Sequence, residues 1–347
     1  MTHLFYKQLA TSLIEKSDTF LFTIIVGNSN LIGEKLLLVG NDAIASNPFT
    51  MLFWDKVLQK IQFEQCPYTF YYANDIKIFV EHISSKPNLV IFGAGHISTH
   101  LSKIANMLNF TVSIVDDREE FANLNRFPEA HKLYCMPFEE AINSINFTNY
   151  TYSVIITRGH ENDRQCLENI INKPNAYIGM IGSKKKVNLI MDYMINNGYD
   201  KSLLNKVHAP IGLRINAKTP EEISISIAAE LIKVRQGDKS TQYFEQDILD
   251  KLQTIKENFV IATIIHKTGS SPRDISSRML VSEDKKILGT IGGGSLEHEI
   301  YKKALDLLKS HTPNAVTVTY TMNNMDATST EMICGGTVDV FLEPVIL

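Results

Sequence analysis

The strongest constraint on the fold is one stretch in the middle of the chain, PNLVIFGAGHISTHLSKIANMLNFTVSIVDD. It predicts a short apolar strand at 89–92, a glycine turn, an amphipathic helix to about residue 108 and a second apolar strand at 112–115. Two strands joined by a helix in this way form a βαβ unit, which belongs to a parallel sheet covered by helices. The sequence therefore predicts an α/β core at the centre of the chain.

The turn of this unit has the residue types of a dinucleotide-binding fingerprint. Gly93 permits a tight turn, and Gly95 lets a phosphate approach the backbone beside His96, at the positive end of the helix. Ser98 replaces the third glycine of the fingerprint, and Asp116 follows Gly95 by 21 residues, where a carboxylate can hold a ribose hydroxyl. We expect a nucleotide-type site here. The alternative is a tight turn that binds nothing.

Two further apolar strands, in YSVIITRGHEND and AYIGMIGSKKK, run into polar or glycine turns and extend the sheet into a doubly wound one. His160 is interpreted either as a site residue or as a solvated loop histidine, and residues 184–186 either as site residues or, as the favoured interpretation, as a solvated helix start. A capped helix in TPEEISISIAAELIKVRQG ends this domain, predicted at 86–236, before the polar linker QGDKSTQ. The residues expected at the ligand edge are Arg158, Gly159, His160, Asp163, Gly182 and Ser183.

The segments that flank the central domain resemble each other. TFLFTIIVGNSN aligns with NFVIATIIHKTG, and DIKIFVEHI aligns with TVDVFLEPV, so residues 1–85 and 245–347 are predicted to be two copies of one β-rich module. Only the second copy has the loops TGSSPR, GTIGGGSLE and CGG. This difference predicts that the first copy is structural and the second carries the chemistry. The alternative is a chance similarity of apolar strands.

The glycine loop of the second copy precedes a predicted helix. Gly292, Gly293 and Gly294 are expected to present backbone N–H groups to a phosphate or another oxyanion, or else to form a simple tight turn. Arg273 and Arg278 are expected to add charge-assisted contacts.

Cys334 is followed directly by Gly335 and Gly336. The glycines leave room around the sulfur, and their N–H groups can stabilise a thiolate, which is the reactive form of cysteine. The alternative is an inert core cysteine.

Composition excludes several classes of protein. A net charge of −4 and a pI near 6.2 disfavour nucleic-acid and membrane-surface partners, and no apolar run has the ~20 residues that a membrane span needs. The N-terminus does not have the pattern of a signal peptide, so a cytoplasmic location is expected. The four cysteines are scattered without a C-x-x-C pair, which predicts neither a disulfide framework nor a metal site.

Several motifs together resemble those of the XdhC/CoxI family, the accessory proteins of molybdenum hydroxylases such as xanthine dehydrogenase and carbon monoxide dehydrogenase. They are GSSPR, GTIGGGSLE and MICGG in the second copy, and GAGHIS, VDDREEFAN, IGMIGSKKK and PIGLRINAKTPEEISISIAAELI in the centre. The resemblance covers roughly residues 88–347. The family commonly places its CoxI-type module before the Rossmann domain, whereas in this chain the motif-bearing module is last.

This resemblance implies a central Rossmann-like doubly wound parallel sheet flanked by two related, smaller α/β modules. It implies a maturation chaperone that binds the molybdenum cofactor, a molybdopterin that can be nucleotide-conjugated, assists its sulfuration and inserts it into the apo-hydroxylase. Its expected partners are that hydroxylase, a cysteine desulfurase-type sulfur donor and a second copy of itself in a homodimer. Carried over by motif, the candidate residues are Cys334, Arg273, Gly292, Gly293, Gly294, Gly335 and Gly336 for the cofactor and Gly93, Gly95, His96, Asp116, Gly182 and Ser183 for the nucleotide-type site.

Two other functions stay open. One is an NAD-dependent oxidoreductase that uses the Rossmann domain for NAD or another nucleotide, although no convincing catalytic constellation follows the fingerprint. The other is a scaffold without a ligand, which only bridges a hydroxylase and a sulfurtransferase.

Overall fold

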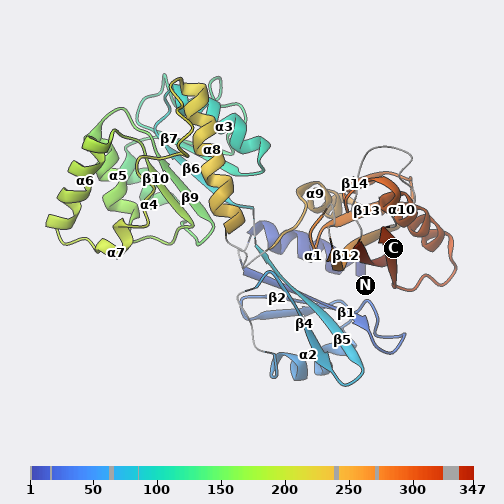
Figure 1. Cartoon of the computed structure of the whole chain (residues 1–347). Coiled ribbons are helices and arrows are strands. Elements are labelled where there is room, and N and C mark those ends of the chain that lie inside the picture. Colours follow the sequence, from blue (N-terminus) through green and yellow to red (C-terminus); the bar gives the residue numbers. More distant parts are fainter. Residues whose placement is uncertain are drawn as a thin grey trace. The chain divides into compact units, whose positions relative to one another are not determined.

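A computed structural model describes residues 2–15, 18–61, 66–84, 86–237, 242–269, 273–322 and 336–347. The chain forms two compact units. One is Lys86–Asp238, and the other combines Met1–Ser85 with Lys239–Leu347. The two flanking segments of the sequence therefore lie in one unit, and the central segment forms the other (Figure 1).

The central unit is built on a five-stranded parallel sheet in the order β10-β9-β6-β7-β8. Its strands are β6 (Asn88–Phe92), β7 (Thr111–Asp116), β8 (Lys132–Cys135), β9 (Thr151–Ile155) and β10 (Tyr177–Met180). Its helices are α3 (His96–Met107), α4 (Phe138–Ser144), α5 (His160–Ile170), α6 (Lys184–Asn196), α7 (Lys201–Leu204) and α8 (Pro220–Gly237). The strand order reverses between β6 and β9, which creates the switch point where α/β sheets of this kind bind ligands.

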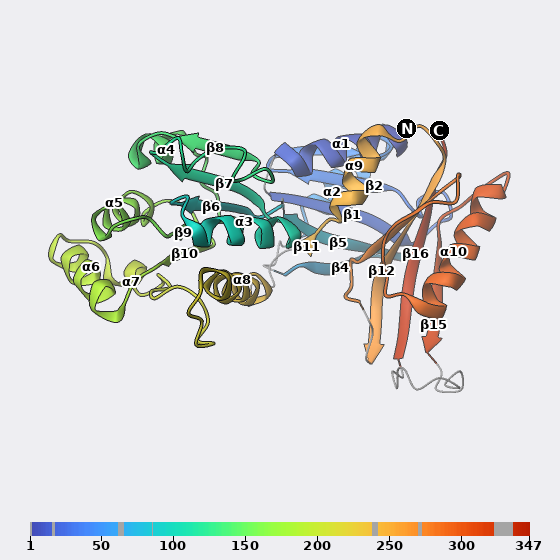
Figure 2. The same cartoon turned by 90° about the horizontal axis from the view of Figure 1, so that it is seen from above.

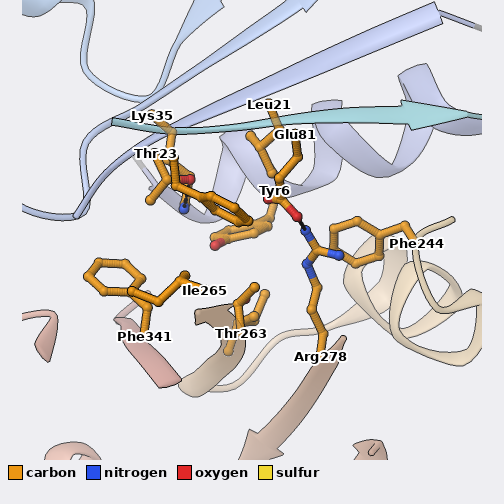
Figure 3. A pocket seen from close by; sticks show the side chains of 12 residues that line it. Tyr6, Leu21, Thr23, Lys35, Glu81, Phe244, Thr263, Ile265, Arg278 and Phe341 are labelled. Carbon is orange, nitrogen blue, oxygen red and sulfur yellow. Dashed lines mark hydrogen bonds and ion pairs between the residues drawn. The ribbon is translucent and has the colours of Figure 1, made fainter. Parts of the chain in front are cut away.

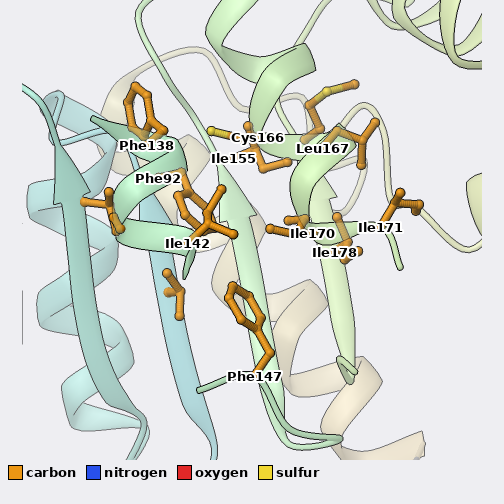
Figure 4. Close-up of a cluster of buried hydrophobic side chains, with 14 of the residues drawn as sticks. Phe92, Phe138, Ile142, Phe147, Ile155, Cys166, Leu167, Ile170, Ile171 and Ile178 are labelled. Atoms are coloured by element: carbon orange, nitrogen blue, oxygen red, sulfur yellow. The ribbon is translucent and has the colours of Figure 1, made fainter. Parts of the chain in front are cut away.

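Helices cover both faces of this sheet. On one face, Leu101 of α3 and Leu231 of α8 pack against strand residues such as Ile91. On the other face, Ile142 of α4 and Leu167 of α5 belong to a second buried cluster, shown in Figure 4. Burial on both faces explains why the strands are continuous apolar runs in the sequence. The predicted Rossmann-like, doubly wound sheet is confirmed.

The other unit contains two antiparallel sheets. The first is formed by β1 (Asp18–Val26), β2 (Lys35–Val39), β3 (Asp42–Ala45), β4 (Tyr68–Ala73) and β5 (Ile76–Ser84), with the short β11 (Gln242–Tyr243) added to β5 in parallel. The second is formed by β12 (Phe259–Gly269), β13 (Arg278–Ser282), β14 (Ile287–Gly289), β15 (Val316–Met322) and β16 (Gly336–Val345). Their helices are α1 (Thr2–Glu15), η1 (Pro48–Thr50), α2 (Met51–Leu58), α9 (Gln246–Thr254) and α10 (Gly294–Lys309).

The two antiparallel sheets have the same topology. The first runs β4-β5-β1-β2-β3 and the second β15-β16-β12-β13-β14, with every one of these neighbours antiparallel. A helix precedes each first strand, α1 before β1 and α9 before β12, and α2 and α10 occupy the same place in the chain order. Even the irregularity recurs, because the ladder shifts between Ile24 and Val26 in one copy and between Ile264 and His266 in the other. The strand order is therefore the one that the sequence repeat predicts.

In the second copy, α10 packs along β12 and β16 (Figure 2). Leu296 and Ile300 of this helix are buried against Val338 and Val340 of β16. This contact covers one face of the sheet, and it fixes the start of α10, where the glycine loop ends.

Candidate functional site

Two hydrogen bonds, one with the neighbouring strand β7 and one with helix α3, hold the glycine turn after β6. Gly93 has φ +106°, and an ideal Cβ on it would lie 2.4 Å from the carbonyl oxygen of Ile156, at the end of β9, so a larger residue does not fit. Its N–H donates to Val115 O at 2.8 Å. Ser98, which is buried, donates its hydroxyl to Gly93 O at 2.5 Å. The serine in the third fingerprint position thus fastens helix α3 to the turn.

Gly95 lies on the open side of the same turn. An ideal Cβ there meets no heavy atom within 4 Å. Gly95 is the N-cap of α3 and supplies no capping side chain, and His96 beside it is exposed. Since first-turn amides have no partner inside a helix, and the helix dipole makes this end positive, the turn combines free space with a preference for anions.

Asp116 is placed behind the turn, with only 1% of its surface exposed. Oδ1 accepts hydrogen bonds from the Arg118 backbone N–H at 3.2 Å and from Arg118 Nε at 2.8 Å. Oδ2 accepts from Ala94 N–H at 2.8 Å and from Arg118 Nη2 at 2.9 Å. Burial alone would raise the pKa of Asp116, but the hydrogen bonds from Arg118 and Ala94 outweigh it and hold the pKa below its usual value.

A carboxylate accepts about four hydrogen bonds, and the four to Asp116 all come from the protein. In this conformation Asp116 positions the turn, and its predicted contact with a ribose stays a prediction. Its neighbour Asp117 is more open, with 34% of the side chain exposed, and pairs with Arg158 Nη2 at 2.9 Å. Because β6 lies between β7 and β9, this ion pair links the strands on either side of the glycine turn.

The loop after β9 forms the other wall of the switch point. Asp163, in the first turn of α5, is fully buried and accepts from Thr157 N–H at 3.0 Å and from the Thr157 hydroxyl at 2.5 Å. The other carboxylate oxygen pairs with Lys186 Nζ, whose side chain is 27% exposed. Gly159 is the N-cap of α5 without a capping side chain, and His160 next to it is exposed.

Lys186 corrects one expectation from the sequence. Lys184 and Lys185 are exposed, as a solvated helix start predicts, but Lys186 is tied to the buried Asp163 and connects α6 to α5. The prediction was therefore wrong for Lys186. Ser183 caps α6 by accepting from Lys186 N–H at 3.3 Å, so this helix start, unlike those of α3 and α5, is capped by its own side chain.

The glycine loop of the second copy is organised around Glu297. Oε1 of this residue accepts from the N–H of Ile291 at 3.0 Å, from the N–H of Gly292 at 3.2 Å and from the Thr290 hydroxyl. Burial by itself would raise the pKa of Glu297, but these contacts and one from the N–H of Gly293 lower it overall. The amides expected to cradle a phosphate are therefore occupied by a carboxylate of the protein. Beside Gly293 and Gly294, an ideal Cβ meets nothing within 4 Å.

The described residues of the three motif loops lie towards one end of the second antiparallel sheet. Gly336, at the start of β16, pairs with Gly269 at the end of β12, so these described glycines of the motifs TGSSPR and CGG lie opposite each other. Tyr320 donates its hydroxyl to Ser295 Oγ at 2.6 Å, which ties the start of α10 to β15 near the same end. Arg273 is exposed at this end. Cys334 and Gly335 lie outside the described residues.

Arg278 does not contribute to this end of the sheet. It is 2% exposed and forms an ion pair with Glu81 of the first copy. The expectation that it adds an anion contact was therefore wrong, because its charge is already neutralised inside the protein.

Within the described ranges, no group of three His, Cys, Asp or Glu side chains is arranged to hold a metal ion. In that same part of the chain, no helix has the length and apolar character needed to cross a membrane.

The fold and the turn define a Rossmann-type domain joined to a duplicated antiparallel module. Comparison with known proteins is consistent with this division. A family model described as the XdhC Rossmann domain matches residues 89–231, and one described as the XdhC and CoxI family matches residues 253–321. Together they match more than half of the chain, which belongs to the XdhC/CoxI family.

Two relatives and one solved structure extend this comparison. The chain is 30% identical over 163 residues to the uncharacterized protein YqeB of Escherichia coli, which is 47% of this chain and 30% of that protein. It is 28% identical over 159 residues to a probable xanthine dehydrogenase subunit of Bacillus subtilis, 46% of each chain. A crystal structure described as a xanthine dehydrogenase from Bacillus halodurans shares the fold, with a TM-score of 0.51 and 21% identity over 67% of this chain and 65% of that one. The chain thus spans less than half the length of the two relatives.

The two glycines of the turn should respond differently to the same substitution. Gly95→Ala enters open space and should lower the free energy of unfolding by less than about 1 kcal/mol. Gly93→Ala forces a positive φ and a clash with Ile156 O, and should cost about 2 kcal/mol or more. Urea unfolding of both variants measures this difference. Equal stability of the two would contradict the described turn.

Asp116→Asn should destabilise the central unit in a pH-dependent way. The loss of charged hydrogen bonds to Arg118 should cost about 2 kcal/mol at pH 7. Because the folded pKa of Asp116 lies below the unfolded value of about 3.9, its contribution is present above pH ~4 and is lost as the pH falls through the folded pKa. The difference in unfolding free energy between parent and variant should therefore shrink from pH 7 towards pH 2. A difference that is independent of pH would rule out this role for the carboxylate.

Proposed function

We propose that this chain is an accessory protein that binds the molybdenum cofactor, assists its sulfuration and helps insert it into a xanthine dehydrogenase-type molybdenum hydroxylase. The observation that carries the proposal is the presence of both family modules in one chain, each with its motif loops. The name of the Bacillus subtilis relative, which calls it a probable part of a xanthine dehydrogenase, supports the choice of partner. The partners in this proposal are the apo-hydroxylase and a cysteine desulfurase-type sulfur donor.

The central unit fits the phosphate end of such a cofactor. Gly95 leaves room for a phosphate, α3 begins without a capping side chain, and Arg158 is exposed at the neighbouring strand end. Arg158 and Lys186 already pair with Asp117 and Asp163, so they would offer N–H donors to a phosphate but little net charge. These residues would bind and orient a phosphate or a nucleotide, including a nucleotide-conjugated pterin or NAD.

The second copy is proposed for the sulfur chemistry and not for phosphate binding. Glu297 occupies the amides of Ile291 and Gly292, so this loop does not suit a phosphate in its described form. The end of the sheet where the described glycines of TGSSPR and CGG lie opposite each other is instead the proposed place for sulfur chemistry, with Cys334 as the contact of the cofactor or of its sulfur. When bound, the cofactor would supply the molybdenum centre whose terminal sulfur activates the hydroxylase.

Cofactor content tests the proposal directly. The protein isolated from cells that make the cofactor should carry pterin, measured by fluorescence after oxidation, and a matching amount of molybdenum. Gly95→Val should lose both, because its side chain fills the space beside the turn. Gly237→Val is the matched control and should retain the cofactor. Gly237 is equally open, but it is the last residue of α8 and not part of the glycine turn.

Each other result has a definite meaning. A parent protein without pterin and molybdenum would contradict the carrier function and leave the scaffold. Full retention by Gly95→Val would remove the glycine turn from the site. Calorimetric binding of NAD that depends on Gly95, without any pterin, would favour an oxidoreductase.

Cys334 should react as an open thiol if it contacts the cofactor or relays its sulfur. In the native protein, iodoacetamide should modify it faster than Cys135, which is exposed, and far faster than Cys166, which is buried. Burial raises the pKa of the Cys166 thiol, so this residue marks the slow limit. Cys334→Ser should leave stability nearly unchanged but should deliver cofactor without its activating sulfur, or retain less cofactor. Protection of Cys334 until unfolding, with full maturation by the serine variant, would show that it only packs.

A further inference from the structure

The two antiparallel sheets contact each other through the same positions of the repeated module. The strand registers define the equivalences: Leu21 pairs with Leu37 across β1 and β2, as Ile261 pairs with Leu280 across β12 and β13. All four side chains lie in one buried cluster, together with residues of α1 and α9. Each copy therefore contributes the same face of its sheet to a joint core.

The same registers identify equivalent polar residues. Thr23 is opposite Lys35, and Thr263 is opposite Arg278, so the two cations occupy the same position in the two copies. The two acids also occupy equivalent positions. Glu81 of β5 is opposite Leu21, and Glu343 of β16 is opposite Ile261. The equivalent pairs are thus Thr23 and Thr263, Lys35 and Arg278, Glu81 and Glu343.

The two cations and the two acids pair across the contact, and Arg278 lies in addition 3.9 Å from Glu245 Oε2 of its own copy. Lys35 Nζ of the first copy lies 2.6 Å from Glu343 Oε2 of the second, and Arg278 Nη2 of the second pairs with Glu81 Oε1 of the first. All four side chains are at most 6% exposed. Exchange of the two copies maps one ion pair onto the other, which is the pattern of a two-fold, self-complementary interface.

Other side chains close this polar centre, as Figure 3 shows. Tyr6 of α1 and Phe244, next to α9, line it together with Lys35, Glu81 and Arg278, around a cavity of about 10 Å³, room for about one water molecule. The Arg278 guanidinium lies 4.1 Å from the Phe244 ring centre. Burial raises the pKa of Tyr6, which keeps its hydroxyl neutral beside Glu343. The centre is therefore filled by the protein and is too small for an organic ligand.

We infer that this face is the self-pairing surface of the repeated module, and that the first copy is retained in the chain as the built-in partner of the second. This role needs the strands and the crossed charges but none of the motif loops, which explains why the first copy lacks them. It also limits the oligomer: a second chain finds this face already occupied, so a homodimer has to use another surface.

The charges make the pairing specific. A buried ion whose partner is removed is strongly destabilising, whereas a matched pair is tolerated. Each face alone would bury one cation and one carboxylate without their ion-pair partners, which is unfavourable. In the folded unit, each copy supplies the oppositely charged partner for both charges of the other copy.

Charge exchange in the full-length chain tests the inference. Lys35→Glu and Glu343→Lys each place like charges together and should lower the melting temperature of the flanking unit by about 10 °C. The double variant restores an opposite pair and should recover at least half of the combined loss, as measured by calorimetry. The matched control is Lys267→Glu with Asp274→Lys, an ion pair inside the second copy whose aspartate is 84% exposed; there neither single change should move the melting temperature by more than about 3 °C.

Two results would overturn the inference. One is a double variant as unstable as the sum of its single changes, which would mean that the crossed pair is absent in solution. The other comes from hydrogen exchange of the β1 and β12 amides at several protein concentrations. A built-in partner gives protection that does not change with concentration, whereas protection that rises with concentration would show that a second chain fills the face. Neither the melting temperature nor the hydrogen exchange depends on cofactor binding. The inference can therefore fail while the proposed function holds, and the reverse is also possible.

Discussion

The ends of β6 and β9 approach so closely that the chain has no room for a side chain at Gly93, where an ideal Cβ would lie 2.4 Å from Ile156 O. The chain must therefore leave β6 with a positive φ and enter α3 at once. This constraint places the uncapped start of α3 at the switch point of the sheet, next to open space at Gly95. Asp116 then fixes the turn from behind through Ala94. The geometry of the candidate site follows from this one close approach.

Local pattern was sufficient for the central fold but not for the roles of its carboxylates. The apolar strands and the amphipathic helices repeat with periods that the sequence shows directly, so the parallel sheet and its switch point were predictable. The full set of partners of Asp116 and Asp163 was not, because Ala94 lies 22 residues from Asp116 and only the folded chain brings such distant groups to each carboxylate. Asp163, for example, precedes Lys186 by 23 residues, and only the packing of α5 beside α6 joins them. The one local signal for Asp163 is its position, because it is a polar residue in the first helical turn after a buried strand.

The flanking modules show the same limit in another form. Their common strand order was predictable from two short alignments of apolar residues, TFLFTIIVGNSN with NFVIATIIHKTG and DIKIFVEHI with TVDVFLEPV. The first alignment is one residue out of register, because the ladders make Thr19 equivalent to Phe259 and not to Asn258. The equivalence of Lys35 and Arg278 was not predictable, since loops of different length separate each of them from its aligned strand. Arg278 was assigned to anion binding because arginine near a glycine-rich loop commonly does this. Its actual environment depends on the other copy of the module, which no local pattern within the second copy describes.

The two glycine loops can be compared by how the protein itself uses their amides. Both lead from a strand into a helix, which by itself favours anions. In the second copy, Glu297 in the first turn of α10 turns back onto the loop amides and supplies the negative charge internally. In the central unit the nearest carboxylate, Asp116, is placed behind the turn, so its own charge is balanced by Arg118 and the helix start stays uncapped. In both loops an acidic residue accepts loop amides, from Ala94 in one and from Ile291 and Gly292 in the other, and both helices begin without a capping side chain. Because Arg118 balances the charge of Asp116, we propose the central unit, and not the second copy, for the phosphate contact of the proposed cofactor.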